Sequence, residues 1–261
     1  MIYPKITVCA EYTKTVKIMD LARLVSGVGE GKRRFSRLHI EDADLTALNG
    51  VDLEFRGCTF ENVDFSNAQL EGLDCNNCSF INCKFVGANL QEAAFQDTTF
   101  FRASTKTIFW RANLRLATFS DCDLRMCDFE RAELFRSEFS NVNGMGTNFL
   151  MASFENATKI VDSAFRYAVF TGAQMEKCTL TNNVFIQAVF QGAKLAGAIL
   201  LGCDLSGATW LHADLRGADV RGANIPSLDV RSMNLAGIKI YESQQRQLLE
   251  TAEVIIFPDG V

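Results

Sequence analysis

Bulky apolar residues recur at every fifth position along most of the chain. They form three blocks, at residues 45–100, 109–154 and 165–240, and the phase shifts by one residue across 101–108 and 155–164. Of the 21 phenylalanines, 17 lie on this lattice. The spacing therefore reflects selection for one large apolar side chain in each group of five residues.

A second lattice of small residues, mostly Ala and Cys, lies two positions before the first, as at Cys83, Ala117 and Ala193. A period of five matches neither an α-helix nor a straight β-strand. Side chains two apart in extended backbone point the same way, so both lattices would face inward while the chain turns a corner every five residues. Four such sides close a square coil of 20 residues, and the coils stack by parallel backbone pairing.

Stacked coils place residues that are 20 apart in one interior column. Phe165, Phe185, Leu205 and Ile225 form such a column and are bulky throughout, as a packed core requires. The 38 lattice positions correspond to about 9.5 coils. With roughly 4.8 Å between paired strands, we expect a rod about 45 Å long.

The five-residue unit is clearest at residues 213–224, which read Ala-Asp-Leu-Arg-Gly-Ala-Asp-Val-Arg-Gly-Ala-Asn. This pattern resembles the pentapeptide-repeat proteins. The resemblance covers residues 35–240 and implies an all-β fold, a right-handed quadrilateral parallel β-helix. Right-handed turns also agree with the general preference of parallel crossover connections.

Residues 1–34 lie outside the pattern and are predicted to form a strand/helix cap, because an open β-helix end exposes unpaired backbone. Apolar and polar residues alternate from Ile6 to Tyr12 as in a strand, and an apolar stripe from Ile18 to Val25 is typical of an amphipathic helix. A separate partner-binding arm is the alternative, since residues 1–37 carry an excess of five basic side chains.

Residues 241–261 are predicted to form a C-terminal helix and strand. Ser243 is a suitable N-cap for a helix over 243–250, and 254–259 read as a terminal strand. The tail resembles that of the quinolone-resistance branch of the family, whose C-terminal module joins two protomers. The resemblance implies a homodimer, and exposed apolar residues on this end would seek cover. The predicted dimer-interface residues are Leu248, Leu249, Ile255, Ile256 and Phe257.

Charge and composition exclude several classes of protein. The chain has 261 residues and a formal net charge of −5, which argues against a protein that coats nucleic acid by neutralising phosphates. No apolar run approaches the ~18 residues of a membrane-spanning helix, and no segment reads as a signal peptide. We therefore expect a cytoplasmic protein that binds neither membranes nor nucleic acid directly, and the resemblance implies that it is bacterial.

The cysteines and histidines do not predict chemistry. Seven of the nine cysteines lie on the small-residue lattice, where they replace Ala as buried apolar groups. Only His39 and His212 could act as bases near neutral pH, and no hydrolase or metalloenzyme motif is present. We expect no metal, no cofactor and no catalytic activity.

The modest net charge hides a strongly acidic segment. Residues 41–100 carry eleven acidic and two basic side chains, a net charge of −9 over three coils. With coils spaced by ~4.8 Å, this density is close to that of B-DNA, which carries one charge per about 1.7 Å. Like charges 20 apart should stack, at a cost in stability. We expect an acidic partner-binding face, with solubility as the alternative role, at Glu41, Asp44, Glu54, Glu61, Asp64 and Asp74.

The resemblance also implies a function for such a face. Members of the quinolone-resistance branch bind type II topoisomerases (DNA gyrase and topoisomerase IV) as DNA mimics and protect them from fluoroquinolones. We expect the same function here, with the phase breaks at 101–108 and 155–164 forming loops or register-correcting bulges. The alternative is a non-enzymatic interaction scaffold, such as a bacterial effector or immunity protein with a different partner and residues 1–40 as its specific element.

Overall fold

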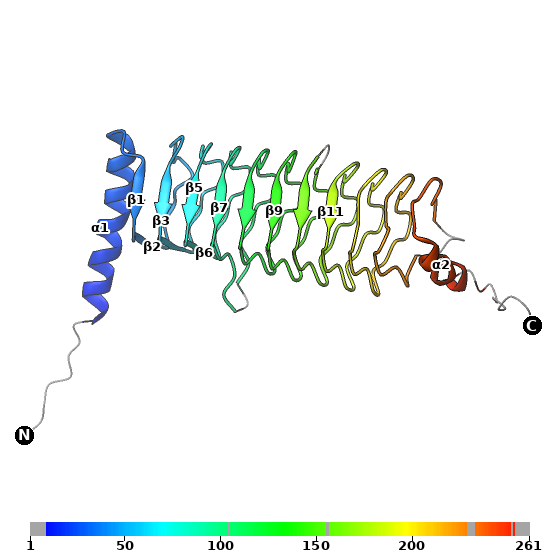
Figure 1. Ribbon diagram of the computed structural model, residues 1–261. Coiled ribbons are helices and arrows are strands. Elements are labelled where there is room, and N and C mark those ends of the chain that lie inside the picture. The colour runs from blue at the N-terminus through cyan, green and yellow to red at the C-terminus, as the bar shows by residue number, and fades with distance from the viewer. Residues whose placement is uncertain (1–8, 104, 155–156, 229–232, 252, 254–261) are drawn as a thin grey trace, which may run out of the picture.

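The computed structural model describes residues 9–103, 105–154, 157–228, 233–251 and 253. The chain winds as a four-sided parallel β-helix, with a long helix across its N-terminal end and a short helix at the other end (Figure 1). The fold class predicted from the sequence is therefore confirmed.

Parallel pairing joins each coil to the next. The elements are α1 (Cys9–Gly29), β1 (Arg34–Ser36), β2 (His39–Glu41), β3 (Glu54–Arg56), β4 (Thr59–Glu61), β5 (Asp74–Asn76), β6 (Ser79–Ile81), β7 (Ala94–Gln96), β8 (Thr118–Ser120), β9 (Glu138–Ser140), β10 (Lys159–Val161), β11 (Thr179–Thr181), η1 (Glu242–Gln244) and α2 (Gln245–Thr251). One face is an eight-stranded sheet in the order β1-β3-β5-β7-β8-β9-β10-β11, and the next face carries the sheet β2-β4-β6. The other two faces pair through single bridges, such as Asn49 with Gln69.

Most corners follow one backbone rule. The amide of a small residue bonds to the carbonyl of the bulky residue three positions earlier, as from Ala68 to Phe65 at 3.0 Å. The residue before the small one has a positive φ, as at Asn67 with 61°. This combination is typical of a type II turn, which favours Gly and Asn at that position. The corner geometry therefore explains why these residues recur at fixed intervals.

The bulky lattice fills the interior. All 17 lattice phenylalanines are fully buried. Rings in one column stack: the Phe129 centroid lies 4.5 Å from that of Phe109 and 5.1 Å from that of Phe149. Rings of neighbouring columns meet edge to face, as Phe119 meets Phe129 at 86°. Aromatic pairs contribute about 0.5–1.5 kcal/mol beyond the area they bury, so this ladder is a main source of stability.

Spacing alone missed three interior positions, Phe35, Ile40 and Ile160, which are all buried. Ile160 pairs with Phe139 and so occupies a regular place in the eight-stranded sheet. It follows the previous interior residue, Phe154, after six residues rather than five. The second phase break is therefore a single extra residue, accommodated at one corner.

The first phase break is a loop. The interior residues Phe100 and Phe109 are nine positions apart, which adds four residues to one corner. The loop projects from the side of the rod (Figure 1), and pairing resumes where Ile108 bridges Lys84. The register of the stack thus continues on both sides of the insertion.

Cysteine and hydroxyl residues on the small lattice also form hydrogen bonds. Cys83 Sγ lies 3.5 Å from the Phe60 carbonyl oxygen, and Thr107 Oγ1 lies 2.7 Å from that of Phe80. The eight cysteines of the β-helix are buried and free, as the sequence predicted. Because these thiols and hydroxyls can donate a hydrogen bond to a carbonyl oxygen, they are not fully interchangeable with Ala.

Helix α1 covers the N-terminal end of the rod. Leu24 is fully buried against the first coil, and Leu21 and Val28 pack beside it. The Asp20 carboxylate is also buried there and accepts the backbone N–H of His39 at 2.8 Å. One helix therefore covers apolar side chains and pairs a backbone donor on the edge of the first coil.

Part of the predicted N-terminal structure is wrong. Ala10 and Tyr12, which alternate with Ile6 and Val8 in the sequence, lie in α1 rather than in a strand; residues 1–8 lie outside the described part. The buried stripe of the helix also differs, since Val25 is 52% exposed. Alternation over four pairs of residues was too short to distinguish a strand from the start of a helix.

Gln244 closes the C-terminal end. Its buried amide nitrogen donates to the carbonyls of Val220 and Ala223, at 2.9 and 2.8 Å. Its amide oxygen accepts the N–H groups of Gly222 and Tyr241, at 3.2 and 2.8 Å. One side chain therefore offers the last complete coil the donor and acceptor that a further coil would provide.

The predicted N-cap Ser243 is wrong, because it lies inside η1. The N–H of Tyr241 is instead held by the side chain of Gln244. Helix α2 overlaps the predicted helical range 243–250 but starts at Gln245 and ends at Thr251. The predicted strand at 254–259 lies outside the described residues.

Candidate protein-binding surfaces

The six acidic residues singled out in the sequence stack in the expected register. The stacked pairs are Glu41 with Glu61, Asp44 with Asp64, and Glu54 with Asp74. Each pair lies on a different face: the first in the three-stranded sheet, the second on the face that follows it, and the third in the eight-stranded sheet. The six side chains therefore do not form the single acidic face that their spacing suggested.

The pair in the eight-stranded sheet is neutralised by arginines. Arg56 Nη2 lies 2.9 Å from Asp74 Oδ2 and 3.9 Å from Glu54 Oε2, and Arg34 Nε lies 2.9 Å from Glu54 Oε1. The sequence concealed this arrangement, because Arg34 belongs to the segment assigned to the cap. The stacking of Glu54 on Asp74 is thus explained by shared cations.

The other two pairs flank one corner of the rod. We define the acidic corner as Glu41, Asp42, Asp44, Glu61 and Asp64. Arg102, from the projecting loop, forms an ion pair with Glu61, and Lys84 Nζ lies 3.8 Å from Asp64 Oδ2. The ring of His39 contacts Glu41. Five carboxylates thus face two permanent cations, which leaves this corner acidic.

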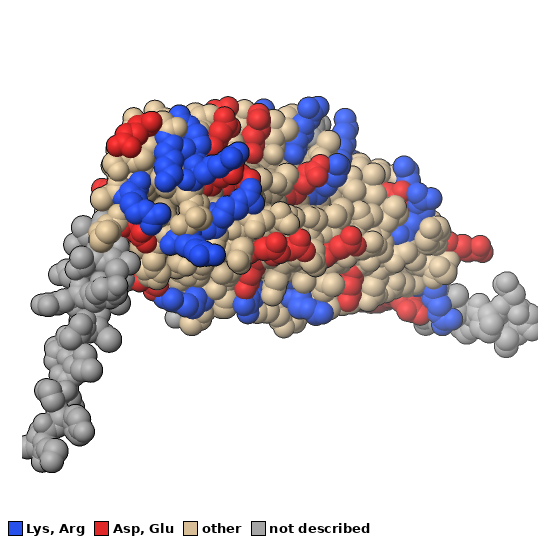
Figure 2. Space-filling view, turned by 60° about the vertical axis from the view of Figure 1, so that its left-hand side comes forward, with Lys and Arg blue, Asp and Glu red and all other residues tan. Residues whose placement is uncertain are grey.

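A hydrogen bond keeps one of these carboxylates charged. The Thr46 hydroxyl donates to Asp44 at 2.7 Å and holds the pKa of that carboxyl below its ordinary value. On the whole surface, however, charges are mixed. On the face drawn in Figure 2, acidic and basic side chains alternate along the rod, and no continuous acidic band is seen.

The two described residues of the predicted dimer interface have different positions. Leu248 is 7% exposed and belongs to the core cluster of its own chain, so it anchors α2 to the rod. Leu249 is half-buried. Ile255, Ile256 and Phe257 lie outside the described residues.

The buried thiols lie in surroundings that suppress their reactivity. Burial raises the pKa of the Cys83 and Cys178 thiols to about 12, and a neutral thiol is a poor nucleophile and metal ligand. Within the described ranges, no three or more His, Cys, Asp or Glu residues are placed to hold a metal ion. Nor does any described helix have the length and apolar character that a membrane crossing requires.

A basic surface that sequence reasoning missed lies in the coils after the loop. The Arg111 guanidinium lies 4.3 Å from the ring centroid of Trp110. Arg115 and Arg136 lie 4.6 and 5.3 Å from that of Phe135. Such contacts hold a cation in place without neutralising it. The sequence signal was Phe135 itself, an aromatic residue in an outward position of the repeat.

Two curated relatives share part of this chain. The pentapeptide repeat protein QnrB4 of Escherichia coli is 33% identical over 94 residues, which are 33% of this chain and 44% of that protein. The quinolone resistance pentapeptide repeat protein QnrB96 of Scandinavium goeteborgense is 32% identical over 157 residues, or 56% of this chain and 63% of that protein. The matched regions thus span less than two thirds of these relatives.

The solved structures of QnrB1, a plasmid-mediated fluoroquinolone resistance protein, are also similar. A trypsin-treated variant has a TM-score of 0.67 at 28% identity and matches 86% of this chain and 100% of its own. The full-length form has a TM-score of 0.61 at 25% identity, over 83% and 100% of the two chains. The similarity therefore extends over the whole of the solved rod.

Family models match the repeats directly. A model of the pentapeptide repeat region matches residues 73–149, and two models of pentapeptide repeats match 165–209 and 202–227. Together these ranges make up more than half of the chain. Along with the five-residue lattice and the four-sided coil, they show that this chain belongs to the pentapeptide-repeat family.

Proposed function

We propose that this protein binds a type II topoisomerase, DNA gyrase or topoisomerase IV, and protects it from fluoroquinolones. The observation that carries the proposal is the match to QnrB1, a fluoroquinolone resistance protein, over the full length of that solved chain at 27–28% identity. The relative QnrB96, which is named for quinolone resistance, supports the same function.

The acidic corner is the part of the surface best suited to imitate DNA. It holds five carboxylates on two coils, which is about 1.9 Å of rod per charge at a coil spacing of ~4.8 Å. B-DNA carries one charge per about 1.7 Å. Before ion pairing, the two densities are therefore similar. Such a corner would also steer the rod toward a positively charged DNA-binding channel.

The ion pairs favour a second candidate, an interaction scaffold whose partner does not bind DNA. Arg34 and Arg56 neutralise the acidic pair of the eight-stranded sheet, and Arg102 and Lys84 reduce the charge of the acidic corner. The arginines held on Trp110 and Phe135 have no counterpart in a DNA surface. These contacts argue for recognition by particular side chains rather than by charge density alone.

A supercoiling assay separates the two candidates. Purified protein is added to DNA gyrase with relaxed plasmid, with and without a fluoroquinolone. The proposed function requires that the protein restore supercoiling in the presence of the drug or inhibit the enzyme at higher concentration. If gyrase and topoisomerase IV both behave identically with and without the protein, the scaffold candidate replaces the topoisomerase proposal.

Charge reversal tests the role of the acidic corner. The combined variant Glu41→Lys, Asp44→Lys and Glu61→Lys should lose protection, whereas Glu133→Lys, Glu138→Lys and Glu242→Lys make the same charge change on other parts of the rod. Circular dichroism checks that both remain folded. Equal protection by the two variants would argue that the corner does not imitate DNA.

We also propose a homodimer formed through residues 241–261. Support comes from the resemblance of the tail to the quinolone-resistance branch and from Leu249, which α2 leaves half-buried at the end of the rod. Sedimentation velocity of the full chain should give twice the monomer mass. A monomer at all concentrations up to 100-fold above those of the supercoiling assay would rule out the dimer.

A further inference from the structure

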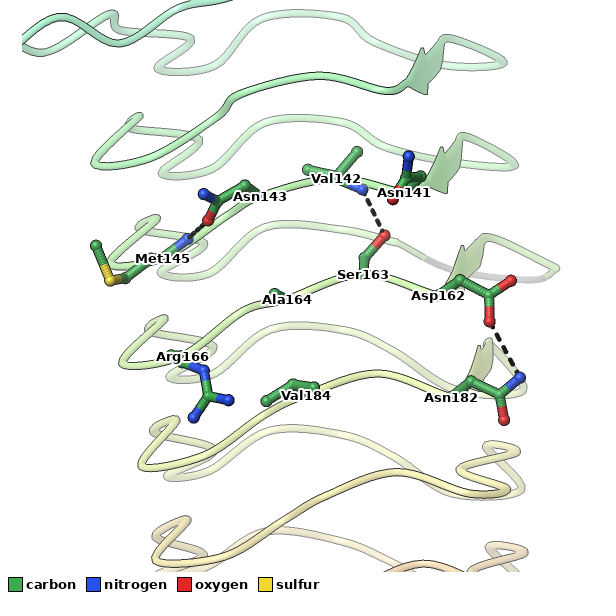
Figure 3. Close-up of a pocket in the computed structure, with 10 residues that line it drawn as sticks. All are labelled: Asn141, Val142, Asn143, Met145, Asp162, Ser163, Ala164, Arg166, Asn182 and Val184. Carbon is green, nitrogen blue, oxygen red and sulfur yellow. Dashed lines mark hydrogen bonds between the residues drawn. The ribbon is translucent and has the colours of Figure 1, made fainter.

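An open hollow lies on the face that continues the sheet β2-β4-β6 toward the C-terminus. It has a volume of about 630 Å³. Its lining residues include Met145 and Arg166 at one end, Asp162 and Asn182 at the other, and Ala164 between them (Figure 3). The hollow spans three successive coils, so it is a feature of stacking rather than of one loop.

Ala164, in the middle of the hollow, stands at a position that several other repeats fill with Asp. In three of the five-residue repeats, an Arg two residues after an Asp folds back onto it across the bulky residue: Arg125 on Asp123 at 2.6 Å, Arg216 on Asp214 at 2.6 Å and Arg221 on Asp219 at 2.8 Å. The sequence Ala164-Phe165-Arg166 has the same spacing, but Ala stands where the others have Asp. The small side chain leaves the arginine without its usual carboxylate.

No described carboxylate forms an ion pair with Arg166, although the arginine interacts electrostatically with Asp204, two coils away. The Arg166 side chain is exposed, and neither an ion pair nor a ring contact with the described residues holds it. The nearby carboxylate of Asp162 accepts a hydrogen bond from Asn182 at 3.1 Å, at the opposite end of the hollow (Figure 3). The guanidinium therefore retains all five of its donors for a molecule outside this chain.

The hollow is lined by apolar side chains together with polar ones, among them Asn141, Asn143 and Asn182. Ala164 and Val184 line it, and Met145 is 38% exposed at its rim. On the adjoining corner, Met126 and Tyr167 are 50% and 55% exposed. Grouped exposed apolar side chains mark interaction sites, and methionine adapts its shape to a bound surface.

We propose that the hollow receives the carboxylate of an Asp or Glu side chain of a protein partner, flanked there by apolar residues. The carboxylate would occupy the space above Ala164 and form with Arg166 the bidentate pair that Asp123 forms with Arg125. A nucleic acid suits the site less well, because successive phosphates along its backbone would also meet Asp162, whereas a single carboxylate can bind at the Arg166 end alone. For the identity of the partner only, the inference rests on the proposed function and points to a topoisomerase subunit.

Three variants test this inference. Arg166→Gln removes the cation, and Ala164→Asp supplies the missing carboxylate from within the chain, as the three existing pairs do. Thr209→Asp is the matched control, since it adds the same charge at an exposed position of another face, and Leu211 rather than an arginine follows two residues later. Binding to immobilised DNA gyrase should weaken roughly tenfold or more in the first two variants and stay within twofold in the third.

A second measurement does not depend on the topoisomerase. The Nε–H signal of Arg166 is followed by NMR during titration with the peptide acetyl-Leu-Asp-Leu-amide and with its Asn analogue. We expect the signal to shift with the Asp peptide alone, and to be shifted already in Ala164→Asp without peptide. A response to neither peptide would overturn the inference whether or not gyrase binds.

The two measurements also separate the two proposals. If gyrase binds the wild type and Arg166→Gln equally well, the hollow is not the contact site and the proposed function stands. If gyrase does not bind but the Asp peptide shifts the signal, the carboxylate site stands and the topoisomerase proposal fails. Stronger binding of a DNA duplex than of the Asp peptide would overturn the assignment to a protein carboxylate.

Discussion

The coils of residues 55–190 and those of residues 191–240 have the same fold but are built from different residues. The first set contains all 17 lattice phenylalanines, whereas the second contains no phenylalanine and has interior Leu, Trp, Val and Ile. At the described corners with positive φ, the second set uses glycine at all but His212, and the first uses mainly Asn, Asp and other residues. We call residues 55–190 the aromatic coils and residues 191–240 the glycine coils. The two sets therefore differ both in their interior residues and at their corners.

The difference shows where each set gains its stability. An L-residue in the left-handed region costs roughly 1–2 kcal/mol, less for Asn and Asp, which tolerate it. Stacked rings, at about 0.5–1.5 kcal/mol per pair, offset that cost in the aromatic coils. The glycine coils have relaxed corners but lack the ring stack. The square coil thus requires both a filled interior and corner residues that tolerate a positive φ. Either of these can make the larger contribution to stability.

Removal of one ring from the stack should have the largest effect. Phe129→Ala breaks the contacts with Phe109 and Phe149, and we expect a loss of about 3–5 kcal/mol in the free energy of unfolding, from the lost burial and the cavity. Leu195→Ala in the glycine coils should cost less, since no ring stack is lost. Urea denaturation followed by circular dichroism measures both. Equal losses would remove the energetic distinction between the two sets.

Loss of the C-terminal amide should come next. Gln244→Leu leaves buried backbone groups of the last coil without partners, and each unsatisfied group costs about 1–3 kcal/mol. We expect about 3 kcal/mol in total, with fraying confined to the glycine coils. Hydrogen exchange read by mass spectrometry should show faster exchange near residues 205–240 and unchanged protection near the aromatic coils. Uniform loss of protection would mean that the rod unfolds as one unit.

Corner substitutions should have smaller effects, which differ between the two sets of coils. Gly217 has a φ of 68° and open space where a Cβ would stand, so Gly217→Ala tests the backbone alone and should cost about 1 kcal/mol. In the aromatic coils, Asn182→Gly relaxes a corner at φ 56° but loses a hydrogen bond to Asp162, so its effect should be near zero. Thermal unfolding gives both values. A stabilising Gly217→Ala would show that corner strain is not what glycine relieves here.

The smallest expected contribution to stability comes from the Asp–Arg ion pairs, and it should be seen when stability is measured at acid pH. Hydrogen bonds from Arg216 and Arg221 hold the pKa of Asp214 and Asp219 below the ordinary value of 3.8. These aspartates therefore stabilise the fold at pH above their unfolded pKa and lose that contribution as the pH falls through the lower folded pKa. Asp214→Asn with Asp219→Asn should lower stability at pH 7 by about 0.2–1 kcal/mol per pair, as for exposed ion pairs.

The pH dependence provides the check. The difference in melting temperature between this double variant and the wild type should be constant from pH 7 to 5 and shrink below about pH 4, near the ordinary pKa of an aspartate carboxyl. Glu242→Gln, which removes a charge outside any such pair, is the control. A difference that grows on acidification would contradict the assigned direction of the shifts.

Much of the rod could be predicted from the sequence, because its core is a one-dimensional pattern. Burial of Phe85, Phe129 and Phe190 follows from spacing alone, and so does the stacking of Glu41 on Glu61. The ends were harder, since they do not repeat. Asp20 and Gln244 act through hydrogen bonds to a backbone edge, and neither residue type nor spacing marks such a role.

The candidate site was predicted less well for a related reason. Spacing gives the register of residues 20 apart but not the cations that approach from the flanking segments, and Arg34 and Arg102 come from such segments. Recognition of the hollow needed a comparison among repeats. Ala164 is unremarkable as an alanine and informative only because Asp123, Asp214 and Asp219 hold the equivalent place in other coils.

Gln244 has a consequence for how such a rod could change its length. The coil stack is closed by the side-chain amide of one residue, Gln244. Its position is fixed because it follows Ala223, one of its partners, by about one coil of sequence. If one whole coil were removed, the Gln244 side chain would still meet the same corner of the last coil. If only one five-residue side were removed, it would meet a different corner. Insertion or deletion of whole 20-residue coils during evolution would therefore change the length of the rod while the C-terminal cap formed by Gln244 is kept.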